Sequence, residues 1–499
     1  MANKPLQYDE STVPAPSLEK ARQENPVFKA GPKGKLTAST PADAVCPHER
    51  QGTDYDRDLD GKIAMTVAII DGVYNTEIIS YSLNLNNKEN SNVGNLVIPI
   101  DAIDPEVFLQ FGKKHIVEIY AGYVSPFDVD KYAKLHGTNR SDSDLTIQPK
   151  ELHKAKFGFR FCGFVDYPEW NFEERTLQLV LMDYLQLLNE TTVSDTFLNR
   201  TPRYILEKIK KAVNGWGMGI SIVYDALAEH VSTQNPLDQK IGDEHFGKKT
   251  VDGKAVEDRA KKDRHYIIRD KSYLQIIKEL ATNSGYAINT CCNIIHIGIP
   301  RVHATEWTFV QKTGATAFEN LNDSDKKVNM TGFVFRKGSL MKNGQKALVI
   351  IEYTRQNPSK KVKVGGTEKT QVQIAKGKRV IYPPGANMQY HGAEDQFVYR
   401  TRVDGIITND NKEKQLQSIA RFIYIRLRRA SETASFTIPI ANPFLLPNHR
   451  AKFAGKQIEF LKKNKYRIQS ISETFDENGW EQQVEVELDL WTSGEFQSL

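Results

Sequence analysis

Residues 159–183 read FRFCGFVDYPEWNFEERTLQLVLMD, and residues 466–488 read YRIQSISETFDENGWEQQVEVEL. In each stretch apolar and polar residues alternate in two runs on either side of a polar turn, which predicts an antiparallel hairpin with one buried face. The second turn contains Asn478-Gly479, and an Asn-Gly pair is a strong hairpin signal because both residues tolerate positive φ. The two hairpins indicate a mainly β chain.

The two hairpins also correspond position by position. Overlaid without a gap, Phe159 falls on Tyr466 and Leu177 falls on Val484. The same overlay aligns Phe161 with Ile468, Phe164 with Ile471, Asp166 with Glu473, Leu179 with Val486 and Leu181 with Leu488. This match of length and register favours a duplicated β-domain, with coincidence between two ordinary hairpins as the alternative. A trimer of such a chain would present six similar units around one axis.

The bulk composition excludes several classes of protein. The 499 residues suffice for roughly two to four domains, and 39% hydrophobic with 26% charged residues is ordinary for a globular protein. A formal net charge of +5 without a recognition module does not indicate a nucleic-acid partner. Four cysteines suit a reducing cytoplasm, and no secretory signal or apolar run of ~20 residues is present. We expect a soluble protein with no membrane and no sequence-specific nucleic-acid partner.

Changes in composition divide the chain into four segments. Residues 1–60 are rich in Pro, Ala and charged residues without apolar period, which indicates an extended N-terminal arm. Strand-like alternation follows, then a region with helical spacing, then strands again. The predicted segments are 61–200, a first β-domain with a surface-loop insertion near 125–156; 201–310, a small α/β domain with a charged, flexible insertion at 234–265; and 311–499, a β-rich region that includes the second β-domain.

Three helices are predicted from their caps and apolar spacing. The first follows a Thr-Pro start and spans 202–214. Asp270 is predicted to cap the second, which stops at Gly285 before a small hairpin within 286–297. The third begins near Asn411 and ends in a basic turn that suits the negative end of the helix dipole.

One acidic run resembles part of a calcium loop. Asp56, Asp58 and Asp60 lie in DRDLDG at 56–61, which copies the first half of such a loop. Val67 stands where a bidentate Glu is required, and the residues in between look like a strand rather than a helix. A solvated acidic turn is therefore the preferred interpretation.

Zinc and nucleotide motifs are incomplete as well. Cys291-Cys292 with His296, and Cys46 with His48, lack a second ligand pair at zinc spacing. The glycines at 215, 217 and 219 follow a predicted helix, whereas a dinucleotide motif follows a strand. The chain has no G-x-S-x-G elbow, H-E-x-x-H helix or complete Walker loop. We therefore expect no catalytic, cofactor-binding or metal-binding residue and no enzymatic activity, and the sequence identifies no partner-binding residue.

Three stretches resemble the baseplate hub proteins of contractile phage tails and related injection systems, a family that includes phage late control protein D. They are the first hairpin at 159–183, the helix and hairpin that begin with DKSYLQIIKELATNSGYAI at 270, and the C-terminal third. That third contains SFTIPIANPFLLPN at 435–448 and the second hairpin. The resemblance covers roughly residues 62–490 and depends on the order of the pieces. The arm and both insertions have no counterpart in it.

The resemblance implies a fold and a set of partners. The fold is mainly β with α+β parts, in which two tube-like β-barrel domains flank a small α/β domain. The partners are two further copies in a homotrimer, a central spike protein, a tail tube or tube-initiator protein, and the tape-measure protein. The implied role is structural: a hub that adapts a three-fold spike to the six-fold tail tube in the baseplate of a virion tail, assembled in the host bacterial cytoplasm.

Two alternatives belong to other functional classes. A tail-associated cell-wall hydrolase would need an acid pair or metal motif, which the sequence does not supply in a supporting context. A carbohydrate-binding adhesin would use some of the 20 Tyr and 5 Trp for stacking on sugars, whereas most aromatic residues occupy predicted core positions.

Overall fold

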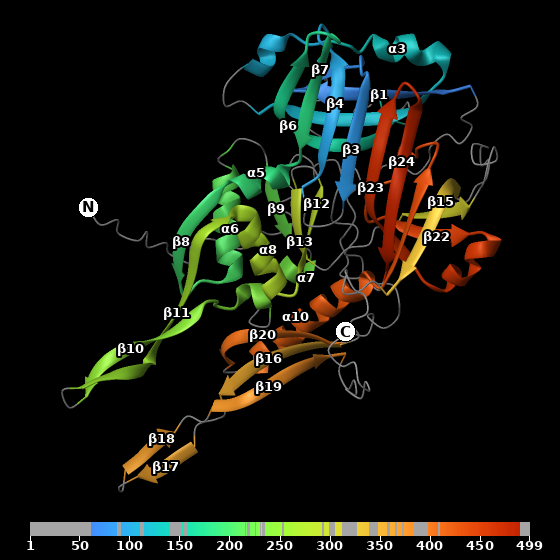
Figure 1. Cartoon of the computed structure of the whole chain (residues 1–499). Coiled ribbons are helices and arrows are strands. Elements are labelled where there is room, and N and C mark those ends of the chain that lie inside the picture. The colour runs from blue at the N-terminus through green and yellow to red at the C-terminus, as the bar shows by residue number, and fades with distance from the viewer. Residues whose placement is uncertain are drawn as a thin grey trace.

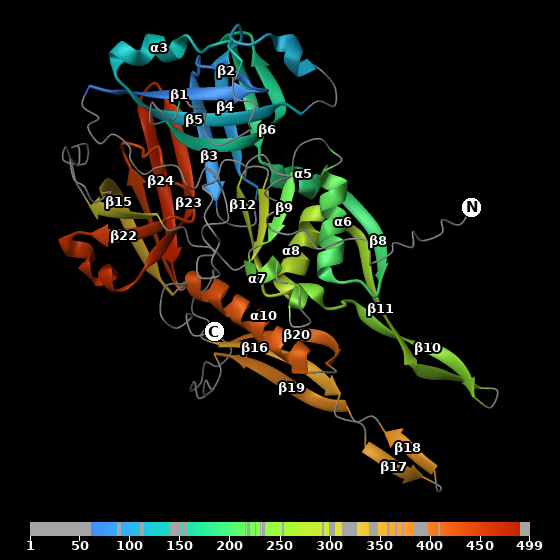
Figure 2. The ribbon, with the colours of Figure 1, turned by 180° about the vertical axis from the view of Figure 1, so that it is seen from behind.

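The computed structural model of the chain is mainly β, as the sequence predicts. It describes residues 61–489 with gaps at 87–90, 110–113, 140–151, 153–156, 215, 217–219, 225, 230, 232–234, 252–253, 292–293, 299–304, 312–326, 339–347, 357–359, 365–366, 372–373, 384–397 and 408–409. Figure 1 shows a β-rich region, an α/β region beside it, and a third region that carries one long helix; Figure 2 shows the same three regions from behind. The N-terminal arm, the acidic run at 56–60 and the Cys46–His48 pair lie outside the described residues.

The first β-domain, here called unit 1, contains six main strands. Each is antiparallel to its neighbours, in the spatial order β1-β5-β6-β7-β4-β3. A short strand β2 (Val73–Asn75) extends the β1 side. The strands are β1 (Ile63–Ile70), β3 (Ser80–Asn86), β4 (Val93–Pro99), β5 (Ile116–Val124), β6 (Gly158–Asn171) and β7 (Thr176–Met182).

The second β-domain, unit 2, is a closed barrel of six strands in the order β14-β22-β23-β24-β21-β15, because β15 also pairs with β14. Its strands are β14 (Glu306–Gln311), β15 (Lys327–Lys337), β21 (Glu432–Ile438), β22 (Arg450–Ala454), β23 (Tyr466–Asp476) and β24 (Gly479–Leu488). In unit 1 the corresponding closure between β3 and β1 does not form, since β3 pairs with β23 instead.

The two units share one topology. Numbered one to six along the chain within each unit, the strands have the spatial order 1-4-5-6-3-2 in both. Strands two to six are antiparallel throughout in both units; only the first strand differs, since β1 is antiparallel to β5 while β14 is parallel to β22. An agreement over six strands is much harder to obtain by coincidence than an agreement between two hairpins.

The predicted equality of register between the two hairpins is wrong. The ungapped overlay places Phe164 on Ile471, yet Phe164 pairs with Met182 whereas Ile471 pairs with Val484. In the first hairpin the strand pair next to the turn is Asn171–Thr176, and in the second it is Asp476–Gly479. The two turns therefore differ in length. Turn length sets hairpin register, and alternation cannot reveal it because any shift by two residues preserves the pattern.

The α/β region has its own hydrophobic core. Helix α6 (Pro202–Asn214) follows the predicted Thr-Pro start. Helix α8 (Tyr273–Asn283) is capped by Ser272, whose hydroxyl accepts from the Gln275 N–H while the Gln275 side chain accepts from the Ser272 N–H. The predicted cap at Asp270 is wrong, because strand β11 (Lys254–Ser272) continues to the residue before the helix. After α8 the chain forms the predicted hairpin of β12 (Ala287–Cys291) and β13 (Ile294–Gly298). Strand β9 (Ser221–Tyr224) pairs with β13 in parallel.

The predicted domain boundary at residue 200 does not coincide with the boundary between the hydrophobic cores of unit 1 and the α/β region. Pairing within unit 1 ends at Met182, and helix α5 (Tyr184–Glu190) and strand β8 (Thr192–Leu198) contribute to the α/β core. At the other end of this region Trp307 already lies in the core shared by the two units, earlier than the predicted start at 311.

Both predicted insertions contain regular structure. Within 125–156, helix α3 (Val129–Ala133) carries the buried Tyr132, which packs with Leu152 and Phe157, so a simple surface loop is wrong. Within 234–265, where a charged, flexible insertion is predicted, β10 (Asp243–Val251) and β11 form a hairpin. A two-stranded ribbon is ordered by its backbone hydrogen bonds, so its sequence need not show apolar alternation. Figures 1 and 2 show this hairpin extending away from units 1 and 2.

The third region is inserted between β15 and β21. Its sheet has the order β19-β16-β20, from β19 (Ile374–Tyr382), β16 (Leu348–Gln356) and β20 (Val398–Ile407), and helix α10 (Asp410–Arg429) packs on it. A second hairpin, β17 (Lys360–Val364) and β18 (Thr367–Gln371), extends to the same side as β10–β11 in both views. Among the described helices, α10 included, none is long and apolar enough to cross a membrane.

Candidate assembly interface at the junction of the two units

Units 1 and 2 meet by direct strand pairing. Strands β3 and β23 pair antiparallel over six positions, from Tyr81–Phe475 to Asn86–Ser470. The Tyr81 and Phe475 rings stack with centroids 5.4 Å apart and planes 6° apart. The junction therefore creates one uninterrupted run of eight antiparallel strands, in the order β6-β7-β4-β3-β23-β24-β21-β15.

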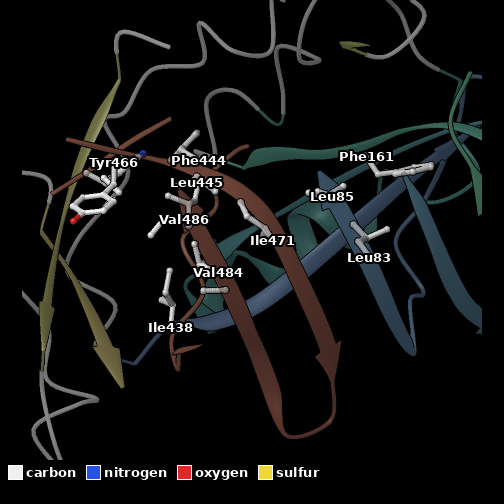
Figure 3. Close-up of a cluster of buried hydrophobic side chains, with 14 of the residues drawn as sticks. Leu83, Leu85, Phe161, Ile438, Phe444, Leu445, Tyr466, Ile471, Val484 and Val486 are labelled. Carbon is white, nitrogen blue, oxygen red and sulfur yellow. The ribbon is translucent and has the colours of Figure 1, made fainter. Parts of the chain in front are cut away.

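A single hydrophobic core backs this eight-strand run. Figure 3 shows Leu83 and Leu85 of β3 together with side chains of the second hairpin. Ile471, Val484 and Val486 of that hairpin belong to the same buried cluster. All five side chains are at most 5% exposed. Burial of apolar surface contributes about 25 cal/mol per Å², and here the buried side chains come from both units, so this core stabilises the two units as one body.

A buried ion pair links the units at the centre of the junction. Arg160 of β6 and Glu473 of β23 both have fully buried side chains. Nε of Arg160 lies 3.0 Å from both carboxylate oxygens and Nη2 lies 2.5 Å from Oε2, which is a bidentate arrangement. Nη1 donates to the Pro443 and Leu445 carbonyls at 3.0 and 2.8 Å. The guanidinium thus fixes β6, β23 and the 443–445 segment together.

The carboxylate of Glu473 has further partners. Gln482 Nε2 donates to it at 3.0 Å and also to the Asn442 carbonyl at 3.1 Å, and the Asn442 N–H donates to Gln482 Oε1. Burial, and after it the negative charge of Glu473, raises the pKa of Tyr81 well above its ordinary value. Because this buried ion pair has so many hydrogen bonds, it favours one position of unit 1 relative to unit 2.

Glycine at 158 permits the close approach of the 443 segment. A Cβ at Gly158 would lie 1.7 Å from the Pro443 carbonyl oxygen, far inside van der Waals contact. Strand β6 can therefore run beside this segment only because residue 158 has no side chain.

The face of the eight-strand run opposite to the core is polar and hollowed. A hollow of about 490 Å³ lies over β3, β15, β21, β23 and β24. Its lining is Asn84, Gly332, Ser435, Phe436, Thr437, Ser470, Ser472, Gln483, Val484 and Glu485. Among the described residues that line the hollow, Glu485 is the one ionisable group, and most of the others offer hydrogen-bonding groups.

A buried carboxylate couples unit 1 to the α/β region. Asp183 caps α5 by accepting from the Leu185 N–H at 3.0 Å, and it accepts from Ser91 Oγ and the Asn92 N–H at 2.6 and 2.7 Å. Burial outweighs these hydrogen bonds and raises the pKa of Asp183 from 3.8 to about 6.

This pKa predicts a pH-dependent stability. The folded chain binds more protons at Asp183 than the unfolded chain between about pH 4 and 6, so stability is fully present below about pH 4 and is lost as pH rises through about 6. Denaturant unfolding between about pH 4 and 7.5 should show this loss, roughly 3 kcal/mol, in the wild type and not in Asp183→Asn. Asp101→Asn, at an exposed ion pair with Arg175, is the control and should keep the wild-type profile. Superimposable profiles for the wild type and Asp183→Asn would contradict the assignment.

Most of the residues considered for chemistry from the sequence lie outside the described part of the chain. Val67 is buried in β1, which starts directly after the acidic run, and His296 is buried in β13. Within the described part of the chain, no three His, Cys, Asp or Glu side chains are grouped to hold a metal ion.

Sequence reasoning missed Arg160 and Glu473. A partial signal was present, since Arg160 stands between two strand phenylalanines and Glu473 lies in the predicted strand at 466–476. Alternation would place Phe159 and Phe161 on one face and Arg160 on the other. In the structure the pairing with β5 shifts by one residue at Arg160, so Phe161 joins the core shared with unit 2 and Phe159 joins a separate cluster.

Comparison of the sequence with family models and with curated proteins gives no match. The fold resembles solved structures of phage tail proteins and of a type VI secretion system component. Phage tails and related injection systems are also what the sequence segments resemble.

Three of the matching structures illustrate the similarity. A tail protein from Neisseria meningitidis has 10% identity and a TM-score of 0.46, over 86% of this chain and 97% of that chain. A prophage tail protein from Shewanella oneidensis has 12% identity and a TM-score of 0.45, over 85% and 98%. An Escherichia coli component of the type VI secretion system has 9% identity and a TM-score of 0.40, over 82% and 73%. These are similarities of fold at low sequence identity.

Proposed function

We propose that this chain is a non-enzymatic hub subunit in the baseplate of a phage tail or related injection device, and that it acts as a homotrimer. The observation that carries the proposal is the pair of topologically equal units joined side by side in one eight-strand run. Three copies would supply six such units around a three-fold axis, which fits a three-fold partner on one side and a six-fold partner on the other.

The partners follow from this geometry and from the sequence resemblance. On the three-fold side the partner is a central spike protein, and on the six-fold side it is a tail tube or tube-initiator protein. The tape-measure protein would end at or near the enclosed lumen. The buried ion pair of Arg160 and Glu473 supports this role, because a rigid angle between the units is needed for six units to form one ring.

The test is the assembly state of the full chain. Sedimentation or mass photometry of the purified protein, alone and mixed with the spike and tube proteins of the same particle, should give a trimer or a complex that contains three copies. Electron microscopy of the particle should place the chain between spike and tube. A stable monomer that ignores both partners would contradict the proposal, and cell-wall degradation by the purified chain would favour the hydrolase instead.

A further inference from the structure

Strands β17 and β18 form a two-stranded ribbon that projects away from the rest of the chain. They pair antiparallel along their whole length, and among the described strands they pair only with each other. The ribbon continues the β16–β19 hairpin, whose own pairing extends to Gln356–Ile374. Figures 1 and 2 both show the ribbon as the outermost part of the third region. Within the described part of the chain, both of its outer edges therefore lack a partner strand.

The segment 355–379, which contains this ribbon, is strongly basic. It holds eight Lys or Arg residues and one acidic residue, Glu368, so its formal charge is +7. The whole chain has a formal charge of +5, so the residues outside this segment together carry a net charge of −2. The excess positive charge of the protein is thus concentrated on one projecting arm.

The register of the ribbon leaves most of this charge without an opposite charge across the strands. Lys363 stands opposite Glu368, the one acidic residue of the segment. The other lysines of the ribbon, Lys360, Lys361 and Lys369, stand opposite Gln, Thr and Val. Because successive residues of a strand alternate between its two faces, Lys361 and Lys363 share one face and Lys360 and Lys369 share the other. Like charges at this density repel one another, so counter-charges from a partner would stabilise the ribbon.

The second projecting hairpin, β10–β11, has a different charge pattern. Residues 243–265 contain seven basic and six acidic residues, a formal charge of +1. The register places Glu257 opposite Lys248 and Glu244 opposite Arg264, so charges of opposite sign face each other across the strands. Strand β8 also pairs with part of the other edge of β11. This hairpin balances its own charges, whereas the β17–β18 ribbon does not.

Three properties of the ribbon favour an acidic polypeptide as its partner. An isolated two-stranded ribbon is only marginally stable in water, and a partner segment at an open edge supplies backbone hydrogen bonds that only another polypeptide can make. The segment 355–379 contains no Phe, Trp or Tyr, so it lacks the stacking side chains with which proteins bind single-stranded nucleic acids. Lysines without a counter-charge are complementary to carboxylates, which steer association and fix the position of a partner.

We infer that the β17–β18 ribbon docks on an acidic surface of another protein subunit in the assembled particle. The lysines without an acidic residue across the ribbon meet carboxylates of that subunit, and an open edge of the ribbon pairs with its backbone. The inference rests on the proposed role as a tail subunit and adds a contact outside units 1 and 2.

Carbodiimide cross-linking of the purified particle tests this contact, because the reagent joins a lysine amine to a carboxylate only where the two groups already touch. Mass spectrometry should find Lys360, Lys361 or Lys369 joined to an Asp or Glu of a different protein of the particle. In a particle that contains the chain, cross-links from these lysines that lead only to the chain itself, or their absence, would overturn the inference alone. A particle without the chain would overturn the proposed function as well.

Two triple variants of the full chain provide a matched comparison. The ribbon variant combines Lys360→Glu, Lys361→Glu and Lys369→Glu. The control combines Lys249→Glu, Lys254→Glu and Lys262→Glu, at lysines of the β10–β11 hairpin that also stand opposite uncharged residues. Both variants change the formal charge of the chain from +5 to −1. The subunit identified by cross-linking, once purified, should bind the ribbon variant about tenfold more weakly or worse, and the control as it binds the wild type. Equal affinities for the two variants would overturn the contact.

Two further measurements separate this contact from nucleic-acid binding and from misfolding. The purified chain is titrated with a DNA duplex of about 30 base pairs between about 50 and 200 mM salt. Binding that falls steeply with salt and that only the ribbon variant loses would assign the ribbon to nucleic acid and overturn the protein contact. Amide exchange at 360–364 and 367–371 should slow in the complex with the subunit, while β24 stays equally protected in both variants. Unchanged exchange in both strands of the ribbon would contradict the edge pairing.

Discussion

Replacing Arg160 with alanine should lower the free energy of unfolding by about 3–5 kcal/mol, because Glu473 would remain buried and charged without its counter-ion. The loss includes the hydrogen bonds to the Pro443 and Leu445 carbonyls, which would face a cavity. Denaturant unfolding followed by tryptophan fluorescence measures it, since the Trp480 ring lies 6.0 Å from the guanidinium carbon.

Two comparison variants test whether the loss of stability comes from the unpaired buried charge. In Arg160→Met with Glu473→Gln, no charge is left buried, so this double variant should be more stable than Arg160→Ala. Arg175→Ala removes an exposed arginine paired with Asp101 and should cost less than about 1 kcal/mol. An Arg160→Ala protein as stable as Arg175→Ala would mean that the pair does not hold the units together.

Replacing Trp307 with alanine should destabilise the chain by about 3–5 kcal/mol, through a large cavity in unit 2. Trp307 is fully buried on β14, and its indole Nε1 donates to His449 Nδ1 at 3.0 Å. The closed barrel depends on β14, because β14 joins β15 to β22. We therefore expect Trp307→Ala to weaken assembly as well, by loosening the strand that ends the eight-strand run.

Milder variants separate the cavity from the hydrogen bond. Trp307→Phe keeps most of the volume and loses the donor to His449, so it should cost about 1–3 kcal/mol. Phe127→Ala removes an aromatic ring that is 96% exposed and should change stability by less than about 0.5 kcal/mol. Thermal and denaturant unfolding of the three variants should follow this order, and equal effects for Trp307→Ala and Phe127→Ala would contradict the packing.

The register of the hairpins shows where local patterns stop being informative. The alternation of Val484, Val486 and Leu488 predicts a strand with one buried face, and β24 buries all three. The Asn478-Gly479 signal correctly predicts the turn, although Gly479 takes positive φ and Asn478 does not. The pairing partners depend on the length of each turn and on the neighbouring strands, and the alternation is the same for every second register.

What the sequence by itself determined is the set of local elements: the mainly β class, the long hairpins, and helices α6, α8 and α10 close to their predicted starts. Caps, turns and apolar periods are properties of a few neighbouring residues, so they can be read without the fold. The tertiary structure alone decided that β3 pairs with β23, that unit 1 stays open, and that Arg160 is buried against a glutamate 313 positions away. Strand edges carry no side-chain signature of their partner, and burial on the second face of a strand depends on what packs there. For that reason the common strand order of the two units was found only in three dimensions.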